Sequence, residues 1–453
     1  MPSAEAPAGG MPLTRKNIFS QSWPIMLANA AAPVVGLVDT FVIGRFTATT
    51  ALAGIGLGAV IYGIAYWGFG FLRMSTAGLA AQSDGAQDEG GVQAHLVRAV
   101  PLGLIIGLLI FLSQIPLLAG AFKIFSGTPD IENAAATYIG ARLWGLPATL
   151  ASIALMGWFV GISRSGLALK MQIVLNAINI ILSPLFVISF GWGLWGVGIA
   201  SAIAEWCGLG TGLWLAYRAI KMRGGFKHEA LSKTALLDAS ALKKLGITNS
   251  NIFIRTMCLT VGFSFFGNAA AAQGVIFLAG YHILMQFITM VALVLDAFAH
   301  TAEAVTGAAY GAKNRERFDK AVRLTTEFSF VFAVIIGALI YVGGPYFITL
   351  LTQDPEVIAS ARRYLPYCAL APILGFAAWQ LDGIFIGTTK TREMRNAGIA
   401  AVIIYITAHY VLTPKLGKDG IWIAFLIYYI SRAITLAFYY PNIRKQMRHA
   451  DGY

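Results

Sequence analysis

Long uncharged stretches recur along the whole chain and dominate its pattern of apolar and polar positions. Four of the longest cover 99–122, 171–204, 328–353 and 256–295, the last interrupted only by His282. A helix needs about 20 mostly apolar residues to cross the hydrocarbon core of a bilayer. The pattern therefore predicts an all-α, polytopic membrane protein.

Turn residues and charges divide these stretches into twelve predicted transmembrane helices. Between the fifth and sixth, Gly191-Trp-Gly-Leu-Trp-Gly196 predicts a tight hairpin with tryptophans at the membrane interface. The twelve predicted spans are 18–43, 51–80, 95–120, 130–157, 167–190, 193–217, 246–272, 275–305, 319–347, 356–387, 394–413 and 419–440.

The two halves of the chain repeat each other. Thr128-Pro129-Asp130 corresponds to Asp354-Pro355-Glu356, and Leu155–Arg164 corresponds to Leu381–Lys390, each pair 226 positions apart. Six spans per copy preserve the orientation of the repeat, so its axis should run along the membrane normal. We expect two pseudo-symmetric six-helix bundles facing each other across a cleft, an architecture typical of transporters.

The same boundaries predict five segments along the chain. An N-terminal tail at 1–17 precedes an N-lobe at 18–217, an inter-lobe loop at 218–245 leads to a C-lobe at 246–440, and a C-terminal tail covers 441–453. An even number of spans places both tails and the loop on one side of the membrane.

Basic residues indicate which side that is. Charged residues make up only 12% of the chain, about half the share of a soluble domain, and the net charge is +12. The inter-lobe loop alone holds Arg218, Lys221, Arg223, Lys227, Lys233, Lys243 and Lys244. By the positive-inside rule, the loop and both termini are expected in the cytoplasm. We therefore expect a multi-pass protein of a bacterial cytoplasmic (inner) membrane, in contact with lipid and not with nucleic acid.

An acid stands inside the first span. Asp39 lies among apolar residues in Gly36–Gly44, with no basic residue nearer than Arg45. Inserting such an acid costs about 2.5–3.5 kcal/mol, so intramembrane acids usually face a cavity and carry function. Burial disfavours the charged carboxylate and hydrogen bonds favour it, so an acid between these effects can exchange a proton near neutral pH. We predict that Asp39 is a cation-responsive acid of a transporter.

Polar side chains of the fifth and sixth spans are candidates to surround this acid. Asn176, Asn179 and Ser183 are three and four positions apart, which places them on one helical face. Counted from the hairpin, Asn179, Ser183 and Ser201 lie at a depth similar to that of Asp39. The alternative is that these groups only join helices by hydrogen bonds.

The second half carries its own set of charged residues. Asp296, His300 and Glu303 share one face of the eighth span, and Arg255 in the seventh lies at the depth of Asp296, which favours an ion pair. Asp382 in the tenth span replaces a methionine of the first copy. We predict a second-lobe network of these residues; a wholly structural ion-pair network is the alternative.

Arg73 and Glu205 also lie within spans. We place Arg73 at a substrate cavity, together with Met285 of the eighth span. No catalytic triad, metal-ligand spacing or phosphate-binding loop occurs in the sequence. We therefore predict a secondary transporter with no catalytic residues, no metal and no cofactor, driven by a gradient of H⁺ or Na⁺.

Five stretches, in this order, resemble the multidrug and toxic compound extrusion (MATE) family and, within it, the DinF-like branch. They are Gly36–Gly44, Phe71–Gln82, Leu295–Ala304, Leu381–Gly387 and Glu393–Asn396. The resemblance covers essentially the whole chain. It implies twelve helices in two lobes around a V-shaped cleft, a monomer, and cation-coupled antiport of amphiphilic organic compounds. It further implies proton coupling at Asp39 and a second-lobe cation site at Asp382.

Two positions depart from the family pattern. Many relatives carry an aspartate where Ser183 stands, so Asp39 is expected to act without a second carboxylate beside it. Relatives also carry Asn-Arg-Asp where this chain has Asn249-Ser-Asn251, which weakens the transfer of the second-lobe network.

Several functions fit this pattern. The first is a proton-coupled exporter of amphiphilic or cationic compounds, with Na⁺ coupling left open. A lipid-linked precursor flippase shares the two-lobe plan, but few arginines are expected to point inward. A receptor is disfavoured by the repeat and by the buried acids.

Overall fold

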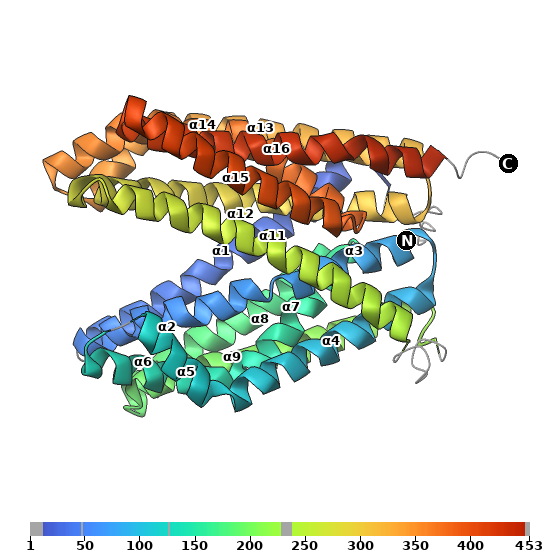
Figure 1. The fold of residues 1–453 in the computed structure, drawn as a ribbon. Coiled ribbons are helices and arrows are strands. Elements are labelled where there is room, and N and C mark those ends of the chain that lie inside the picture. Colours follow the sequence, from blue (N-terminus) through green and yellow to red (C-terminus); the bar gives the residue numbers. More distant parts are fainter. Residues whose placement is uncertain (1–11, 47–48, 126, 228–237, 449–453) are drawn as a thin grey trace. The chain divides into compact units, whose positions relative to one another are not determined.

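The chain folds into two compact units (Figure 1). The computed structural model describes residues 12–46, 49–125, 127–227 and 238–448. Unit 2 spans Trp23–Lys243, and unit 1 joins the described residues up to Ser22 with those from Lys244 onward. The predicted loop segment at 228–237 and the end of the C-terminal tail at 449–453 lie outside the described residues.

Unit 2 consists of helices in the part that the structure describes. In chain order they are α1 (Arg15–Phe46), α2 (Thr49–Gly68), α3 (Phe71–Gly85), α4 (Glu89–Leu112), α5 (Gln114–Ile124), α6 (Pro129–Arg142), the 3₁₀ turn η1 (Leu143–Gly145), α7 (Leu146–Gly161), α8 (Ser165–Pro184), the π turn η2 (Leu185–Ser189) and α9 (Gly193–Met222).

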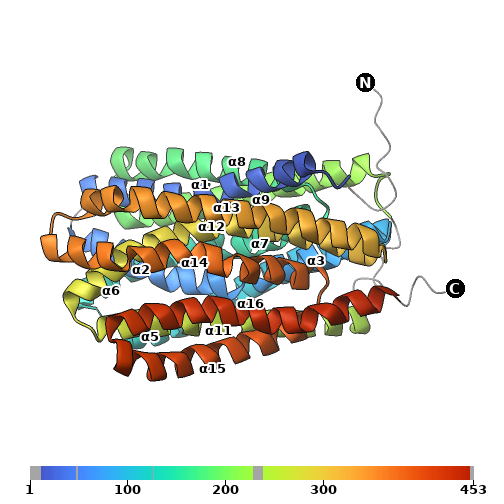
Figure 2. The same cartoon turned by 90° about the horizontal axis from the view of Figure 1, so that it is seen from above.

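In its described residues, unit 1 contains six long helices and the start of α1. They are α11 (Ala239–Ala271), α12 (Val275–Gly311), α13 (Arg315–Leu351), α14 (Pro355–Gly387), α15 (Thr391–Leu416) and α16 (Lys418–Arg448). In Figures 1 and 2, α11, α15 and α16 run alongside one another. The prediction of an all-α polytopic protein is confirmed.

Breaks inside predicted spans account for most differences from the expected helices. Eleven stretches are long and apolar enough to cross a membrane among the described residues. The predicted span 51–80 is instead two helices, since α2 ends at Gly68 and α3 starts at Phe71. Glycines at 68 and 70 favour this break because they leave the backbone with more freedom than any other residue. The spans 95–120 and 130–157 are likewise interrupted, at Ser113 and at η1.

The helix α1 contributes to both units. Its first turns pack in unit 1, where Ser22 Oγ lies 2.8 Å from Thr301 Oγ1 of α12 and Arg15 pairs with Glu327 of α13 at 2.7 Å. From Trp23 onward the helix belongs to unit 2, and it continues through Pro24 and Pro33. Each proline removes a backbone donor, so the helix is weakened at these two points without ending there.

The internal repeat is visible in the backbone. The non-glycine residues with positive φ are Gln87, Ser163, Lys313 and Thr389, which form two pairs 226 positions apart. Each of Gln87 and Lys313 precedes a helix whose N-cap side chain, from Asp88 or Asn314, accepts a hydrogen bond from the backbone three residues on. The same turn is therefore built twice.

Close helix packing also repeats. A side chain at Gly157 of α7 would collide with the Arg73 carbonyl of α3, and one at Gly383 of α14 would collide with the Ala299 carbonyl of α12. These positions are related by the same 226-residue offset. Small residues allow such an approach of helix backbones, which is a common way to pack helices in membranes.

Aromatic side chains fill the core of unit 1. Phe266 of α11 stacks on Phe425 of α16 with 4.1 Å between ring centres, and it meets Trp422 edge-on at 4.9 Å. Tyr405 of α15 stacks on Tyr428 with 5.1 Å between ring centres. Such pairs contribute about 0.5–1.5 kcal/mol beyond their buried area. The core therefore fixes α11, α15 and α16 around the polar groups that they carry.

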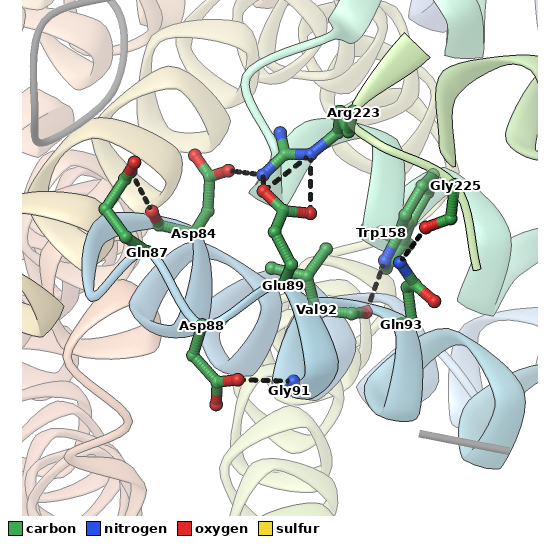
Figure 3. Close-up of polar contacts among 10 residues, drawn as sticks. All are labelled: Asp84, Gln87, Asp88, Glu89, Gly91, Val92, Gln93, Trp158, Arg223 and Gly225. Carbon is green, nitrogen blue, oxygen red and sulfur yellow. Dashed lines mark hydrogen bonds and ion pairs between the residues drawn. The ribbon is translucent and has the colours of Figure 1, made fainter. Parts of the chain in front are cut away.

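An ion-pair cluster fastens the end of α9 to α3 and α4 (Figure 3). Arg223 donates to Asp84 Oδ1 at 2.5 Å and, from Nε, to Glu89 Oε1 and Oε2 at 3.1 and 3.0 Å. Burial lowers the pKa of the Arg223 guanidinium, but its bonds to Glu89 and the charge of Asp84 outweigh burial, and the pKa lies above its ordinary value. The guanidinium therefore stays charged at physiological pH.

Unit 1 has a counterpart of this fastening made from other residues. Arg444 of α16 donates to Asp319 Oδ2 of α13 at 2.7 Å, and the Tyr310 hydroxyl donates to Gln446 Oε1 at 2.9 Å. Asp319 corresponds to Gln93 of unit 2, which donates to the Gly225 carbonyl at 3.0 Å (Figure 3). In both units, equivalent positions of α4 and α13 therefore bond to the end of the unit's last helix or to the chain just after it.

Replacing Gly157 or Gly383 by alanine is expected to destabilise the protein, because the new methyl group meets a neighbouring carbonyl. Overpacking of this kind costs about 1–3 kcal/mol. Thermal unfolding of the purified protein in detergent measures the effect. Gly63→Ala and Gly246→Ala, where nothing lies within 4 Å of the new methyl group, are the matched controls. Equal melting of Gly383→Ala and Gly246→Ala would contradict the packing argument.

Candidate functional site

Asp39 lies buried in unit 2 with a hydroxyl group as its hydrogen-bond donor. The apolar sequence around it makes α1 a continuous helix, and Asp39 is 3% exposed. Ser183 Oγ of α8 donates to Asp39 Oδ1 at 2.7 Å. The structure thus brings together the first-span acid and Ser183, one of its predicted partners.

The other predicted partners of Asp39 form a polar row along α8. Asn179, one turn before Ser183, donates from Nδ2 to Ser201 Oγ of α9 at 2.9 Å, and its Oδ1 is buried without a hydrogen-bond partner among the described residues. Asn176 instead accepts a hydrogen bond from Gln172 of its own helix at 2.8 Å. Ser183 therefore contacts Asp39, Asn179 and Ser201 pair with each other one helical turn away, and Asn176 is engaged along α8.

A second polar layer in unit 2 was not predicted. Arg142 ends α6, and its Nη1 donates to the Tyr138 hydroxyl one turn earlier at 2.5 Å. The guanidinium lies 4.3 Å from the ring centre of Tyr62 and 3.8 Å from Glu205 Oε1. The charge of Arg142 also acts on Asp39, so the two layers are electrostatically connected.

Unit 1 holds a buried carboxylate between two guanidinium groups. Asp382 of α14 pairs through Oδ2 with Arg255 of α11 and with Arg432 of α16, the latter at 2.7 Å. All three side chains are buried. Depth along the helices favoured Asp296 as the partner of Arg255; the structure gives Arg255 the carboxylate of Asp382.

Aromatic rings surround the second guanidinium. Arg432 lies 6.0 Å from the ring centre of Trp379 and 5.8 Å from those of Tyr428 and Tyr429. Cation–π contacts of this kind stabilise a desolvated cation. Arg255, Asp382 and Arg432 also line a small pocket of unit 1.

The remaining predicted residues lie on α12 and α3. Glu303 is fully buried and Asp296 and His300 are half-buried on α12, and the charge of Asp296 acts on Tyr429. Met285 of α12 packs against the hydrophobic core of unit 1. Arg73 is half-buried near the start of α3. The structure therefore places Asp296, His300 and Glu303 together on α12 of unit 1.

Two arginines are the main residues that sequence reasoning missed. Arg142 and Arg432 each lie inside a predicted span, at 130–157 and 419–440. The signal was available, because a basic residue within a span is as costly as an acid. The predictions started from the buried acids and matched each acid to residues at the same depth in the membrane. Depth alone does not show which helices are neighbours.

The buried acids of both units have guanidinium and hydroxyl groups as partners. Among the described ranges, no three His, Cys, Asp or Glu side chains converge as metal ligands would. Carboxylates within apolar helices are instead balanced by guanidinium and hydroxyl groups. Such groups can exchange a proton or an organic cation when a second conformation changes their neighbours.

The helical architecture, the repeat and the intramembrane carboxylates define a polytopic membrane transporter. A family model described as MatE matches residues 24–185 and 252–411. The chain belongs to this family, and the predicted resemblance is confirmed, as is the prediction of a transporter rather than an enzyme.

Individual relatives agree with this assignment. The chain is 31% identical to DNA damage-inducible protein F of Escherichia coli (strain K12), over 93% of this chain and 91% of that protein. It is 24% identical to a probable multidrug resistance protein NorM of Acinetobacter baylyi, over 93% and 94% of the two chains. A crystal structure of MATE in complex with MaD5 superposes with a TM-score of 0.85 at 18% identity, covering 99% and 100% of the two chains. That last likeness supports the fold.

Replacing Asp382 by asparagine is expected to destabilise unit 1 strongly, because two guanidinium groups then stay buried without their carboxylate. Removing one partner of a buried ion pair costs about 3–5 kcal/mol. Thermal unfolding in detergent measures the loss. Asp354→Asn, which removes an exposed acid of the same helix region, is the control. A melting temperature unchanged by Asp382→Asn would refute a stabilising role for this group.

Proposed function

We propose that the protein is a cation-coupled antiporter that exports amphiphilic or cationic organic compounds by alternating access, with the proton as the coupling ion. The observation that carries this proposal is the buried carboxylate of Asp39, whose hydrogen-bond donor is the neutral hydroxyl of Ser183. A carboxylate in such surroundings gains stability when it binds a proton or another cation.

Coupling follows if proton and substrate favour opposite conformations of the transporter. A ligand shifts a conformational equilibrium only by its difference in affinity for the two states. Neutralising Asp39 changes the charge of a helix already weakened at Pro24 and Pro33. We infer that protonation favours one shape of α1 and that substrate favours the other.

The substrate class is inferred from relatives and from the chemistry of the site. The Acinetobacter relative is named a probable multidrug resistance protein. An acid that attracts cations suits compounds with an apolar body and a positive charge. We propose such small molecules as substrates, for a monomer embedded in the bacterial inner membrane with both termini cytoplasmic.

A lipid-linked precursor flippase is the alternative function. The sequence disfavoured a flippase because few arginines were expected to point into the protein. In the structure, however, Arg142, Arg255 and Arg432 lie inside their units. Each of them contacts a carboxylate of its own unit. They therefore balance internal acids, and the observation still favours a cation exporter over a carrier of anionic lipids.

Asp39→Asn is expected to abolish drug resistance conferred on a pump-deficient host, lowering it to the level of the empty vector. The asparagine keeps the size of the side chain but cannot gain or lose a charge. Growth in the presence of ethidium measures resistance, and immunoblotting checks expression. Asp130→Asn, an exposed acid of unit 2, should keep wild-type resistance. Wild-type resistance in the Asp39→Asn strain would sink the coupling role.

Ethidium efflux from proteoliposomes identifies the coupling ion. An imposed pH gradient should drive efflux by the wild-type protein, whereas an imposed Na⁺ gradient at equal pH should not. Efflux that depends on Na⁺ alone would replace the proton by sodium in the proposal. No efflux under either gradient, together with lipid translocation, would favour the flippase.

A further inference from the structure

Another buried carboxylate of unit 2, Glu205, lies on α9 one helical turn from Ser201. Ser201 and Glu205 of α9 are four residues apart, as are Asn179 and Ser183 of α8 and Tyr138 and Arg142 of α6. Residues four apart in a helix lie above one another on the same face. Because Asn179 donates to Ser201, Ser183 beside Asp39 lies one turn from this pair along α8, and Glu205 beside Arg142 lies one turn from it along α9.

The Glu205 carboxylate is incompletely satisfied. Its Oε1 accepts a hydrogen bond from the Tyr62 hydroxyl at 3.3 Å and lies 3.8 Å from Arg142 Nη2. Its Oε2 is buried with no hydrogen-bond partner among the described residues, and the side chain is 8% exposed. A buried acceptor without a donor is costly, so this oxygen is suited to receive a proton or a cation.

The absence of a side chain at Gly145 leaves room for the Glu205 carboxylate. A side chain at Gly145, at the end of η1, would collide with Glu205 Oε2. The interruption between α6 and α7 therefore coincides with the point where the carboxylate enters the helix interface. The Tyr62 hydroxyl, which also lies 3.2 Å from Thr149 Oγ1, holds the other oxygen.

The ionisable groups around Glu205 come from two neighbouring helices. Arg142 and Tyr138 belong to α6, and Tyr62 belongs to α2; α7 and η1 contribute the Thr149 hydroxyl and Gly145, and α8 brings Asn179 to Ser201 one turn away. Arg142 acts electrostatically on both Glu205 and Asp39. One guanidinium therefore serves two buried carboxylates.

The charge balance of this group leads to the inference. With both acids ionised, Asp39, Glu205 and Arg142 sum to −1, and a net charge in a low-dielectric interior is strongly disfavoured. One proton, or one monovalent cation, restores neutrality. We propose that Glu205 is a second exchangeable carboxylate of the unit 2 site, joined to Asp39 through Arg142, and that the two acids share one proton or one organic monocation.

This inference deepens the proposed function and rests on it for the identity of the cation. It also differs from the expectation that Asp39 acts as a single acid. In the proposal the second carboxylate comes from Glu205 of α9, not from position 183 of α8. Substrates with a single positive charge are predicted to exchange for one proton. Dications would leave the site with excess charge and are predicted to bind more weakly.

Infrared difference spectroscopy between low and high pH tests the carboxylate directly, in the purified full-length protein without substrate. Protonated buried carboxyl groups give a C=O band that disappears on ionisation. The wild-type difference spectrum should contain one component that Asp39→Asn removes and another that Glu205→Gln removes. Glu205→Asp, which keeps a carboxyl group, should restore a component, and Asp130→Asn should leave the spectrum unchanged. A Glu205→Gln spectrum identical to wild type would overturn the proposal.

Ethidium binding at several pH values provides the second readout. A proton that competes with one cation weakens apparent affinity by about tenfold per pH unit on the acidic side. Glu205→Gln should flatten this dependence while the protein still elutes as a folded species, and unchanged pH dependence would count against the inference. If the wild-type protein binds no ethidium, the proposed substrate class fails, and the infrared result still decides whether Glu205 exchanges a proton.

Discussion

Neutralisation of buried charge is the constraint on which the arrangement of both units depends. An isolated ion within an apolar helix is expensive, so each buried acid must find a counter-charge or a donor on another helix. Asp382 meets this requirement with two guanidinium groups, from α11 and α16. Asp39 meets it with one hydroxyl. Asp382 is thus balanced by two buried cations, whereas the hydrogen-bond donor of Asp39 is a neutral hydroxyl group.

The repeat separates the frame of the protein from its chemistry. The left-handed turns at Gln87 and Lys313 recur at the 226-residue offset, as do the glycine contacts of Gly157 and Gly383. The charged residues of the two buried clusters do not recur: by the same offset, Arg142 corresponds to Cys368, Glu205 to Ser431 and Asp382 to Met156. Each unit thus uses one helical scaffold to hold a different set of ions.

The sequence predicted the helical scaffold well because the lengths of apolar stretches, the turn residues and the repeat can all be read along the chain. None of these signals requires knowing which helices pack together. The sequence also predicted that Ser183 lies at the depth of Asp39, because Ser183 was counted back from the hairpin that follows its span and Asp39 lies in the outer half of the first span. It did not predict the break between α2 and α3, because the apolar pattern continues across Phe69. Nor did it find Arg142 or Arg432. Their partners lie 63 and 50 positions away, at Glu205 and Asp382, and only the packing of helices decides which residues at one depth meet.

The contrast between the two units bears on how coupling is divided between them. In unit 1, two guanidinium groups face the single carboxylate of Asp382. In unit 2, two acids face Arg142, and the balance is reversed. Because an entering proton or organic cation is stabilised where negative charge is in excess, the proposed exchange is expected in unit 2. In unit 1, Asp382 balances both guanidinium groups, and the rings of Trp379, Tyr428 and Tyr429 surround that of Arg432.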